Sequence, residues 1–181
     1  MKTDIIILAA GNSSRFQGNK LLYPFQGIPL IQHTFNVLRM VDANNIIVVT
    51  QYEQLSTLAK SYGYVCLNNN HPEWGISYSI HLGLREVQSD QVMFLVGDQP
   101  KLSSTTLQGM IDAADGSMIL AAGYGEQPKN PVIFPRRYYE ELHQLRGDVG
   151  GRAVLARYPD QVRIYETDPD EVRDIDKKSD L

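Results

Sequence analysis

The chain has 181 residues, of which 43% are hydrophobic and 21% charged, and its net charge is −4 at pH 7. These values are ordinary for a globular protein, and we expect a single domain over residues 1–181 with a sizeable core. A nucleic-acid-binding surface needs clustered lysines and arginines, so the acidic balance and the lack of any basic run argue against a nucleic-acid partner.

The cellular compartment is indicated by the cysteine content and by the first apolar run. The single cysteine, Cys66, cannot form an internal disulfide, which fits a reducing compartment. The apolar run at residues 5–10 is too short for a membrane span or for the core of a signal peptide. We therefore expect a cytoplasmic protein without a membrane partner.

Apolar runs of strand length alternate with longer runs of helical period along the first half of the chain. Residues 4–10 (DIIILAA) have no polar alternation, which indicates a strand that is buried on both faces. A helix is predicted at residues 31–40, and a second buried strand at 45–50 (NIIVVT). The pattern then predicts helices at 54–61 and 75–87 and strands at 64–67 and 91–96.

The predicted elements after residue 97 are shorter. Ser103 or Ser104 is a suitable cap for a helix that ends at Ala114. A short strand at 131–134 is expected to run antiparallel to one at 117–122. Further helices are predicted at 137–145 and 151–158, and a strand at 162–165. This alternation predicts a Rossmann-like three-layer α/β/α domain with a mostly parallel, twisted sheet and a small antiparallel addition.

Two polar stretches follow strands of this predicted sheet. Residues 8–20 (LAAGNSSRFQGNK) end the first strand, and residues 97–100 (GDQP) come after the strand at 91–96. In open α/β sheets the ligand lies outside the carboxyl ends of the strands. We therefore expect these two stretches, far apart in sequence, to meet in one cleft.

The first stretch has the composition of a phosphate-binding loop without the spacing of a common one. Gly11 and Gly18 are seven residues apart, too far for a P-loop or for the dinucleotide fingerprint. Glycines nevertheless let backbone amides approach an anion, Arg15 offers a planar fork of donors and Lys20 a mobile charge. Ser13 and Ser14 add hydroxyl donors, and we expect the loop to hold a triphosphate; a solvated surface turn is the alternative.

Six segments of the chain resemble signature segments of the nucleotidyltransferases related to the molybdenum cofactor cytidylyl- and guanylyltransferases, in the same order. They are LAAGNSSRFQGNKLL, NNNHPEWGISYSIHLGL, LVGDQPKLS, KNPVIFPRRYYEEL, GDVGGRAVL and DIDKKSDL. The chain departs from the family pattern at Ile76 in place of Met, at Asn130 in place of His, and at Lys177–Lys178 in place of Thr-Pro. The resemblance implies the fold of the nucleotide-diphospho-sugar transferases.

The resemblance also implies an activity and a cofactor. The reaction would transfer CMP from CTP to the terminal phosphate of molybdopterin, a phosphorylated pterin, with release of pyrophosphate and with Mg²⁺ as cofactor. Ala10 resembles the cytidylyl branch, because the guanylyl branch usually has glycine there. The alternatives are GTP as the nucleotide, another phosphorylated acceptor such as a sugar phosphate or phospholactate, and a weakly catalytic accessory protein that carries the cofactor to a molybdenum enzyme.

Residue roles follow from the same resemblance. Arg15, Lys20 and Asp98 are the expected catalytic residues, and Asp98 and Asp176 the expected metal ligands, with Asp174 as the alternative to Asp176. The expected nucleotide-binding residues are Leu8, Ala9, Ala10, Gly11, Ser13, Ser14, Arg15, Lys20, Asn69, Gly75 and Ser77. The expected acceptor-binding residues are Asn130, Pro131 and Arg152.

Besides Asp176, three of these assignments leave an alternative open. Asn69 has asparagines on both sides, so its register is uncertain by one residue. Ser77 opens a predicted helix and could equally be a cap, and Arg152 could equally be a solvated helix residue. Trp74, next to Gly75, is expected to be an exposed aromatic side chain at the cleft.

Overall fold

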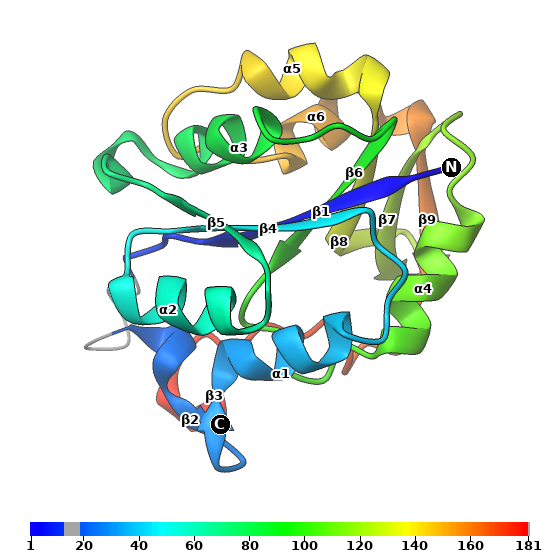
Figure 1. Ribbon diagram of the computed structural model, residues 1–181. Helices are drawn as coiled ribbons and strands as arrows, with labels where there is room; N and C mark the ends of the chain where they lie inside the picture. The colour runs from blue at the N-terminus through cyan, green and yellow to red at the C-terminus, as the bar shows by residue number, and fades with distance from the viewer. Residues whose placement is uncertain (13–18, 181) are drawn as a thin grey trace.

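The computed structural model describes residues 1–12 and 19–180, and its main feature is a seven-stranded sheet between two layers of helices (Figure 1). The strand order is β5-β4-β1-β6-β8-β7-β9. The strands are β1 (Thr3–Ala9), β4 (Asn45–Thr50), β5 (Val65–Asn68), β6 (Gln91–Val96), β7 (Ile119–Tyr124), β8 (Gln127–Pro135) and β9 (Val162–Glu166).

The sheet is mostly parallel, as predicted. Strand β1 pairs in parallel with β4 and β6, β4 with β5, and β7 with β9, whereas β8 is antiparallel to both of its neighbours. The predicted three-layer architecture is therefore confirmed. The antiparallel strand is longer than expected, since it begins at Gln127 rather than at residue 131.

The two helical layers cover separate hydrophobic cores (Figure 1). Successive side chains of a strand point to opposite faces, so Ile5 and Ile7 of β1 pack in one core and Ile6 in the other. One layer holds α1 (Leu30–Leu38), α2 (Glu53–Ser61) and α4 (Ser104–Ala113), and the other holds α3 (Ile76–Leu84), α5 (Tyr139–His143) and α6 (Arg152–Arg157). No helix of the described chain is long and apolar enough to cross a membrane.

Most predicted elements are present with shifted ends, and one small element was missed. Strands β4 and β6 have the predicted bounds, and Ser103 caps α4 by accepting a hydrogen bond from the Thr106 amide at 3.1 Å. The predicted helix at 137–145 is a 3-10 turn followed by the short α5. A two-stranded hairpin, β2 (Pro24–Phe25) and β3 (Ile28–Pro29), was not predicted; its turn uses positive φ angles at Gln26 and Gly27.

Candidate active site

The two polar stretches leave neighbouring strands at the same edge of the sheet. Leu8 of β1 is opposite Val96 of β6 in the parallel register, so the chain after Ala10 and the chain after Gly97 start side by side. This confirms that the two stretches meet. Ser13, Ser14, Arg15 and Gly18 of the loop lie outside the described residues.

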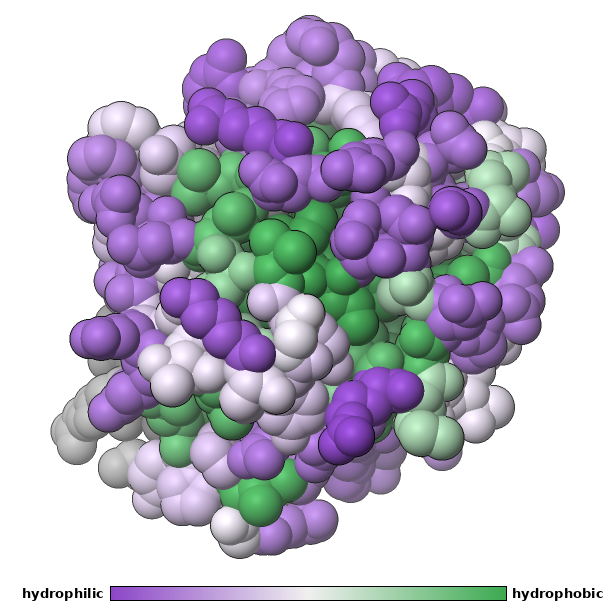
Figure 2. All heavy atoms as spheres, in the orientation of Figure 1, coloured by the Kyte–Doolittle hydropathy of each residue, from purple (hydrophilic) through white to green (hydrophobic). Residues whose placement is uncertain are grey.

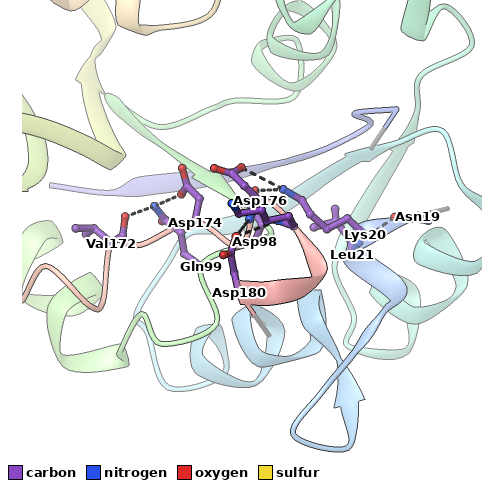
Figure 3. A network of polar contacts seen from close by, with 10 residues as sticks. Asn19, Lys20, Leu21, Asp98, Gln99, Val172, Asp174, Asp176 and Asp180 are labelled. Atoms are coloured by element: carbon purple, nitrogen blue, oxygen red, sulfur yellow. Dashed lines mark hydrogen bonds and ion pairs between the residues drawn. The ribbon is translucent and has the colours of Figure 1, made fainter. Parts of the chain in front are cut away.

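Lys20 and Asp98 form the closest contact between the two stretches (Figure 3). The Lys20 Nζ donates to Asp98 Oδ2 at 2.7 Å, and the two side chains are only 16% and 17% exposed. Packing of the next residue explains the contact: Leu21 is buried, and its Cδ2 would lie 3.1 Å from a side chain at position 97, where the chain has glycine. Leu21 therefore fits against Gly97 and places Lys20 beside Asp98.

The start of this turn is fixed locally. Asn19 precedes a 3-10 helix at Lys20–Leu22, and its Oδ1 accepts a hydrogen bond from the Leu21 amide at 3.0 Å. A side chain that caps a helix start removes an unsatisfied donor and fixes the direction of the following turn. The position of Lys20 is thus set by a cap on one side and by core packing on the other.

The C-terminal segment lies beside Asp98 because backbone and side-chain bonds hold it there. The Ile175 amide donates to the Asp98 carbonyl at 2.9 Å, and both Val172 and Ile175 are buried. The buried Gln99 donates through Nε2 to the Val172 carbonyl at 3.1 Å and to Asp174 Oδ1 at 2.8 Å. Gln99 was not predicted as a site residue, and it anchors the segment that carries both predicted acids (Figure 3).

Asp176 and Asp174 differ in how they approach the Lys20–Asp98 pair. Asp176 Oδ1 is 3.9 Å from Lys20 Nζ, whereas Asp174 is bonded to Gln99 instead. Partial burial of its carboxyl group raises the pKa of Asp174, and so do the nearby carboxylates of Asp98 and Asp176, while the Gln99 bond and Lys20 oppose the rise. Of the two acids, Asp176 is the one that shares the lysine with Asp98.

The chemistry of these groups suits a divalent cation that is shared with phosphates. Within residues 1–12 and 19–180, no three or more His, Cys, Asp or Glu side chains are grouped to hold a metal ion by themselves. Mg²⁺, however, often takes only one or two carboxylates and completes its shell with water and substrate phosphates. Asp98 fits this use, because its Oδ1 is buried and has no hydrogen-bond partner in the described chain.

We call residues 8–20 the signature loop. A cavity of about 410 Å³ lies at the start of this loop, and we call it the nucleotide-side cavity. Several predicted nucleotide-binding residues line it, namely Leu8, Ala10, Gly11, Asn69 and Gly75. Ala9 is buried in the core and does not line it. Ser77 does not line it either; it is buried, and its amide donates to the Gly147 carbonyl at 3.2 Å, while Ser79 faces the cavity in its place.

Asn69 is buried and already has local partners. Its Oδ1 accepts from the His71 amide at 2.8 Å, and its Nδ2 donates to Ser79 Oγ at 2.9 Å. An amide nitrogen carries two hydrogens, so one donor of Asn69 is free to face the cavity. Trp74 is 52% exposed, as expected, and its ring stacks on His71 with centroids 4.0 Å apart.

Residues from neighbouring elements hold the walls of this cavity and were not predicted. Gln51 donates through Nε2 to the Ala10 carbonyl at 2.7 Å and to Asn12 Oδ1 at 2.9 Å, and the Tyr52 hydroxyl donates to the Gly11 carbonyl. Asp148 lines the opposite wall, and its Oδ1 accepts from the Ile76 amide at 3.4 Å. Asp148 faces the start of α3, which has no side-chain cap of its own, and no local sequence signal indicates this contact.

Gly75 joins the two sides of the cleft. Its φ is +83°, and a Cβ at this position would lie 2.3 Å from the carbonyl carbon of Gly147. Only glycine permits both the backbone conformation and the close approach. The segment around Asp148 therefore packs directly on the residue that starts α3.

A second cavity of about 270 Å³, which we call the inner cavity, continues the cleft toward β8 and α6. It shares Leu8, Ile76 and Val96 with the nucleotide-side cavity. Of the three predicted acceptor-binding residues, Asn130 and Arg152 line it and Pro131 does not. On the face of the molecule seen in Figure 1, hydrophobic side chains gather in the middle and hydrophilic ones surround them; this view marks neither cavity (Figure 2).

Sequence comparisons identify a family of nucleotidyltransferases that this chain matches over most of its length. The model of the MobA-like NTP transferase domain matches residues 5–162. The chain is 31% identical to the molybdenum cofactor guanylyltransferase of Vibrio atlanticus over 171 residues, which are 91% of this chain and 84% of that protein. It is 30% identical to the bifunctional protein GlmU of Geotalea uraniireducens over 75% of this chain, but spans only 33% of that relative.

The solved structures support the fold. Rv0371c from Mycobacterium tuberculosis superimposes with a TM-score of 0.83 over 99% of this chain and 95% of that one, at 23% sequence identity. At this level of identity the likeness concerns the arrangement of the elements, and the residue roles depend on the site itself.

Proposed function

This chain belongs to the MobA-like NTP transferase domain family and is a nucleotidyltransferase, and from that premise we propose that it transfers CMP from CTP to the terminal phosphate of molybdopterin. The observation that supports this proposal best is the Lys20–Asp98 pair. Asp98 follows strand β6, whose Val96 lines both the nucleotide-side and the inner cavity. A cation and a carboxylate are thus next to a cleft with room for two substrates.

In the proposed reaction an oxygen of the acceptor phosphate attacks the α-phosphorus of CTP. A new P–O bond forms, the bond from the α-phosphorus to the oxygen that bridges it to the β-phosphate breaks, and pyrophosphate leaves with that electron pair. The attacking phosphate is already ionised at neutral pH, so no strong general base is required. Catalysis then consists of positioning and of charge neutralisation.

The protein groups that we assign to the triphosphate are the cations and amides of the signature loop. Lys20 is fixed by Asn19 and Leu21 and offers three donors, and Gly11 lines the nucleotide-side cavity. Arg15, Ser13 and Ser14 keep their assigned roles as further donors to the phosphates. Asn69 and Gly75 are assigned to the nucleoside, because both line the same cavity.

Asp98 and Asp176 are the residues that we assign to Mg²⁺. Asp98 contacts Lys20 through Oδ2 and keeps a buried Oδ1 without a partner in the described chain, and the exposed carboxylate of Asp176 also approaches Lys20. Carboxylate oxygens are the ligands that this ion prefers. When bound, the ion would neutralise charge on the triphosphate. On the acceptor side we assign Asn130 and Arg152 to the acceptor phosphate. We assign Pro131 a structural role, which is to set the course of strand β8 next to Asn130.

We infer the choice between CTP and GTP from the residue at position 10 in the wall of the nucleotide-side cavity. Ala10 lines this cavity, and the extra methyl group relative to glycine leaves less room for a purine, which favours CTP. One methyl group discriminates by about 10- to 100-fold at most. The second candidate is therefore transfer of GMP from GTP, and the identity with the Vibrio atlanticus guanylyltransferase supports it.

Thermal unfolding with each nucleoside triphosphate, with and without Mg²⁺, tests the proposal. CTP at about a hundred times its Kd should stabilise the protein by about 2.7 kcal/mol, and GTP by less. A larger shift with GTP would select the second candidate. Pyrophosphate release with CTP and molybdopterin then tests the transfer itself, and a lack of any triphosphate-dependent shift or release would refute the proposal.

A further inference from the structure

Successive side chains at the end of β4 bind successive backbone carbonyl groups at the end of β1. They do so in order: the Thr50 hydroxyl donates to the Ala9 carbonyl at 3.0 Å, Gln51 Nε2 to the Ala10 carbonyl at 2.7 Å, and the Tyr52 hydroxyl to the Gly11 carbonyl at 2.9 Å. The parallel register places Ala9 opposite Thr50, so the two segments leave the sheet next to each other. We call Gln51 and Tyr52 the carbonyl clamp, because they hold the chain where it enters the signature loop.

The carbonyl clamp is itself held by regular structure. Gln51 and Tyr52 form the whole connection between Thr50, the last residue of β4, and Glu53, the first residue of α2. The Tyr52 amide donates to Thr50 Oγ1 at 3.1 Å, and its carbonyl accepts from the Ser56 amide at 3.0 Å. The Tyr52 side chain also packs against the core. A side chain that is anchored in this way can hold its partner in a precise position.

Gln51 makes a second hydrogen bond, which reaches further into the signature loop. Its Nε2 also donates to Asn12 Oδ1 at 2.9 Å, so both hydrogens of this amide are in use. Asn12 lines the nucleotide-side cavity, whereas neither residue of the clamp does. The clamp therefore lies behind the wall of the cavity and acts on it through the backbone of the loop.

A held carbonyl also sets the direction of the next backbone amide. A peptide unit is planar and trans, so the C=O of one residue and the N–H of the next point in opposite directions. Because the carbonyls of Ala10 and Gly11 point at the clamp, the amides of Gly11 and Asn12 point away from it. Neither amide donates a hydrogen bond to any residue that the structure describes, and both residues are exposed and line the nucleotide-side cavity. Successive backbone amides of this kind form a concave binding site for an anion.

We propose that the carbonyl clamp is a positioning device for the triphosphate, which it serves by turning the amides of Gly11 and Asn12 toward the phosphate oxygens. This inference rests on the proposed function and adds to it two residues that do not touch the nucleotide. Donors that already point at the phosphates need no reorganisation when the nucleotide binds. Without the clamp the two carbonyl oxygens would be free to turn into the cavity and repel the phosphates.

Substitutions of similar size remove the hydrogen bonds of the clamp. Tyr52→Phe removes only the hydroxyl, Gln51→Met removes the donor to both oxygens, and the double variant removes the clamp. Tyr62→Phe is the control for a lost hydroxyl that donates to another side chain. Gln108→Met is the control for a glutamine with two hydrogen bonds. Neither control residue lines the nucleotide-side cavity.

The probes are CTP, inorganic tripolyphosphate and cytidine, each added to ¹⁵N-labelled protein and followed by NMR. In the wild type, CTP and tripolyphosphate should shift the amide protons of Gly11 and Asn12 downfield, because hydrogen bonds to phosphate oxygens deshield them. These shifts should be smaller in the double variant. Its affinity for both probes should fall by about 10-fold, and that of each single variant by about 3-fold, because hydrogen bonds to a charged group are weakened.

Cytidine has no phosphate, so it should bind the clamp variants and the wild type alike. Both control variants should bind all three probes like the wild type. Urea denaturation checks that each variant is folded. If the double variant does not fold, the same comparison is made with Tyr52→Phe, which removes a single oxygen atom.

Signals of Gly11 and Asn12 that stay in place while tripolyphosphate binds the wild type would overturn the inference. So would folded clamp variants that bind CTP as tightly as the wild type, or an equal loss of affinity for cytidine and CTP, since the clamp would then only shape the cavity. If the wild type releases pyrophosphate while one of these results is found, only the positioning role is wrong. If the wild type neither binds a nucleoside triphosphate nor releases pyrophosphate, the proposed function is wrong.

Discussion

The two halves of the cleft position their polar side chains in different ways. In the first half, Asp98 comes two residues after the end of the parallel strand β6, and Lys20 starts the 3-10 helix at Lys20–Leu22 in the connection between β1 and β2. In the second half, Asn130 comes from a bulge within the antiparallel strand β8, and Arg152 from the first residue of α6. We call them the loop half and the strand-and-helix half.

This difference indicates that the two halves have different roles in binding. The loop half brings opposite charges together at 2.7 Å, which suits the handling of phosphates and their counter-ions. The strand-and-helix half presents a mostly apolar surface with separated cations, which suits the recognition of a shape. Substitutions in the loop half should therefore change the chemistry more than the stability, whereas substitutions where the halves join should change the stability as well.

Asp98→Asn should have the largest effect on turnover, about a 1000-fold loss, because it removes a charged ligand at the reacting phosphates. The free energy of unfolding should change little, because asparagine can still accept a hydrogen bond from Lys20. The carboxylate of Asp176, 3.9 Å from the Lys20 Nζ, also remains to balance the charge of the lysine. Pyrophosphate release and urea denaturation measure the two quantities. Asp170→Asn, an exposed acid paired with Lys101, is the matched control. More than a tenth of wild-type turnover in the Asp98 variant would show that the loop half does not carry the chemistry.

Lys20→Met should change two affinities in opposite directions. Affinity for CTP should fall by about 10- to 100-fold, because a donor to the phosphates is lost. Affinity for Mn²⁺ in the absence of nucleotide should rise, since Lys20 and a divalent cation compete for the carboxylates of Asp98 and Asp176. Calorimetry measures the first and electron paramagnetic resonance the second, with Lys101→Met as the control. If Mn²⁺ binds no more tightly than to the wild type, the lysine and the metal do not share these oxygens.

Gly75→Ala compared with Gly63→Ala tests the joint between the halves. Both glycines have φ near +80°, but a Cβ at position 75 would lie 2.3 Å from Gly147, and one at position 63 has no neighbour within 4 Å. Gly63→Ala should cost about 1 kcal/mol of unfolding free energy from backbone strain alone, and Gly75→Ala about 3 kcal/mol because the 147–150 segment must also move. Urea denaturation measures both. Equal costs would mean that this contact does not hold the halves together.

Asp174→Asn should have the smallest effect, and its sign depends on pH. The pKa of Asp174 is raised in the folded protein, first by partial burial of the carboxyl group and then by the charge of Asp98, so the charged carboxylate opposes folding at neutral pH. Asparagine keeps an acceptor for Gln99, so the variant should be more stable by less than about 1 kcal/mol at neutral pH. The gain should decrease as the pH falls and be lost by about pH 3, below the ordinary pKa of an aspartate, where the acid is protonated in both states. Denaturation at the two pH values checks this, and a variant that is less stable at neutral pH would contradict it.

The sequence predicts the loop half well, because its rule is local. An apolar run of strand length marks β1 and β6, and in parallel sheets the ligand edge follows their carboxyl ends, so Lys20 and Asp98 could be expected to meet. The opposite was true where the arrangement depends on packing between distant segments. Asp148 and Ile76 are 72 residues apart, and nothing in either local sequence indicates their contact.

The strand-and-helix half was harder to predict for an identifiable reason. Prolines at 128 and 131 are typical of strand ends and edges, so the pattern predicted a four-residue strand where β8 has nine residues. The bulge directs Lys129 and Asn130 toward the same recess, and the pattern of polar and apolar residues in the sequence gives no sign of it. Gln99 was missed because a lone glutamine has no characteristic spacing, although its two hydrogen bonds fix the C-terminal acids.

The most direct test of the account is transfer of label from CTP that carries ³²P at its α-phosphate. With molybdopterin and Mg²⁺, the account predicts that the label enters the acceptor, that one pyrophosphate is released for each transfer, and that Asp98→Asn reduces both together. Release of the label as free CMP or CDP without transfer, or equal rates for wild type and Asp98→Asn, would contradict it.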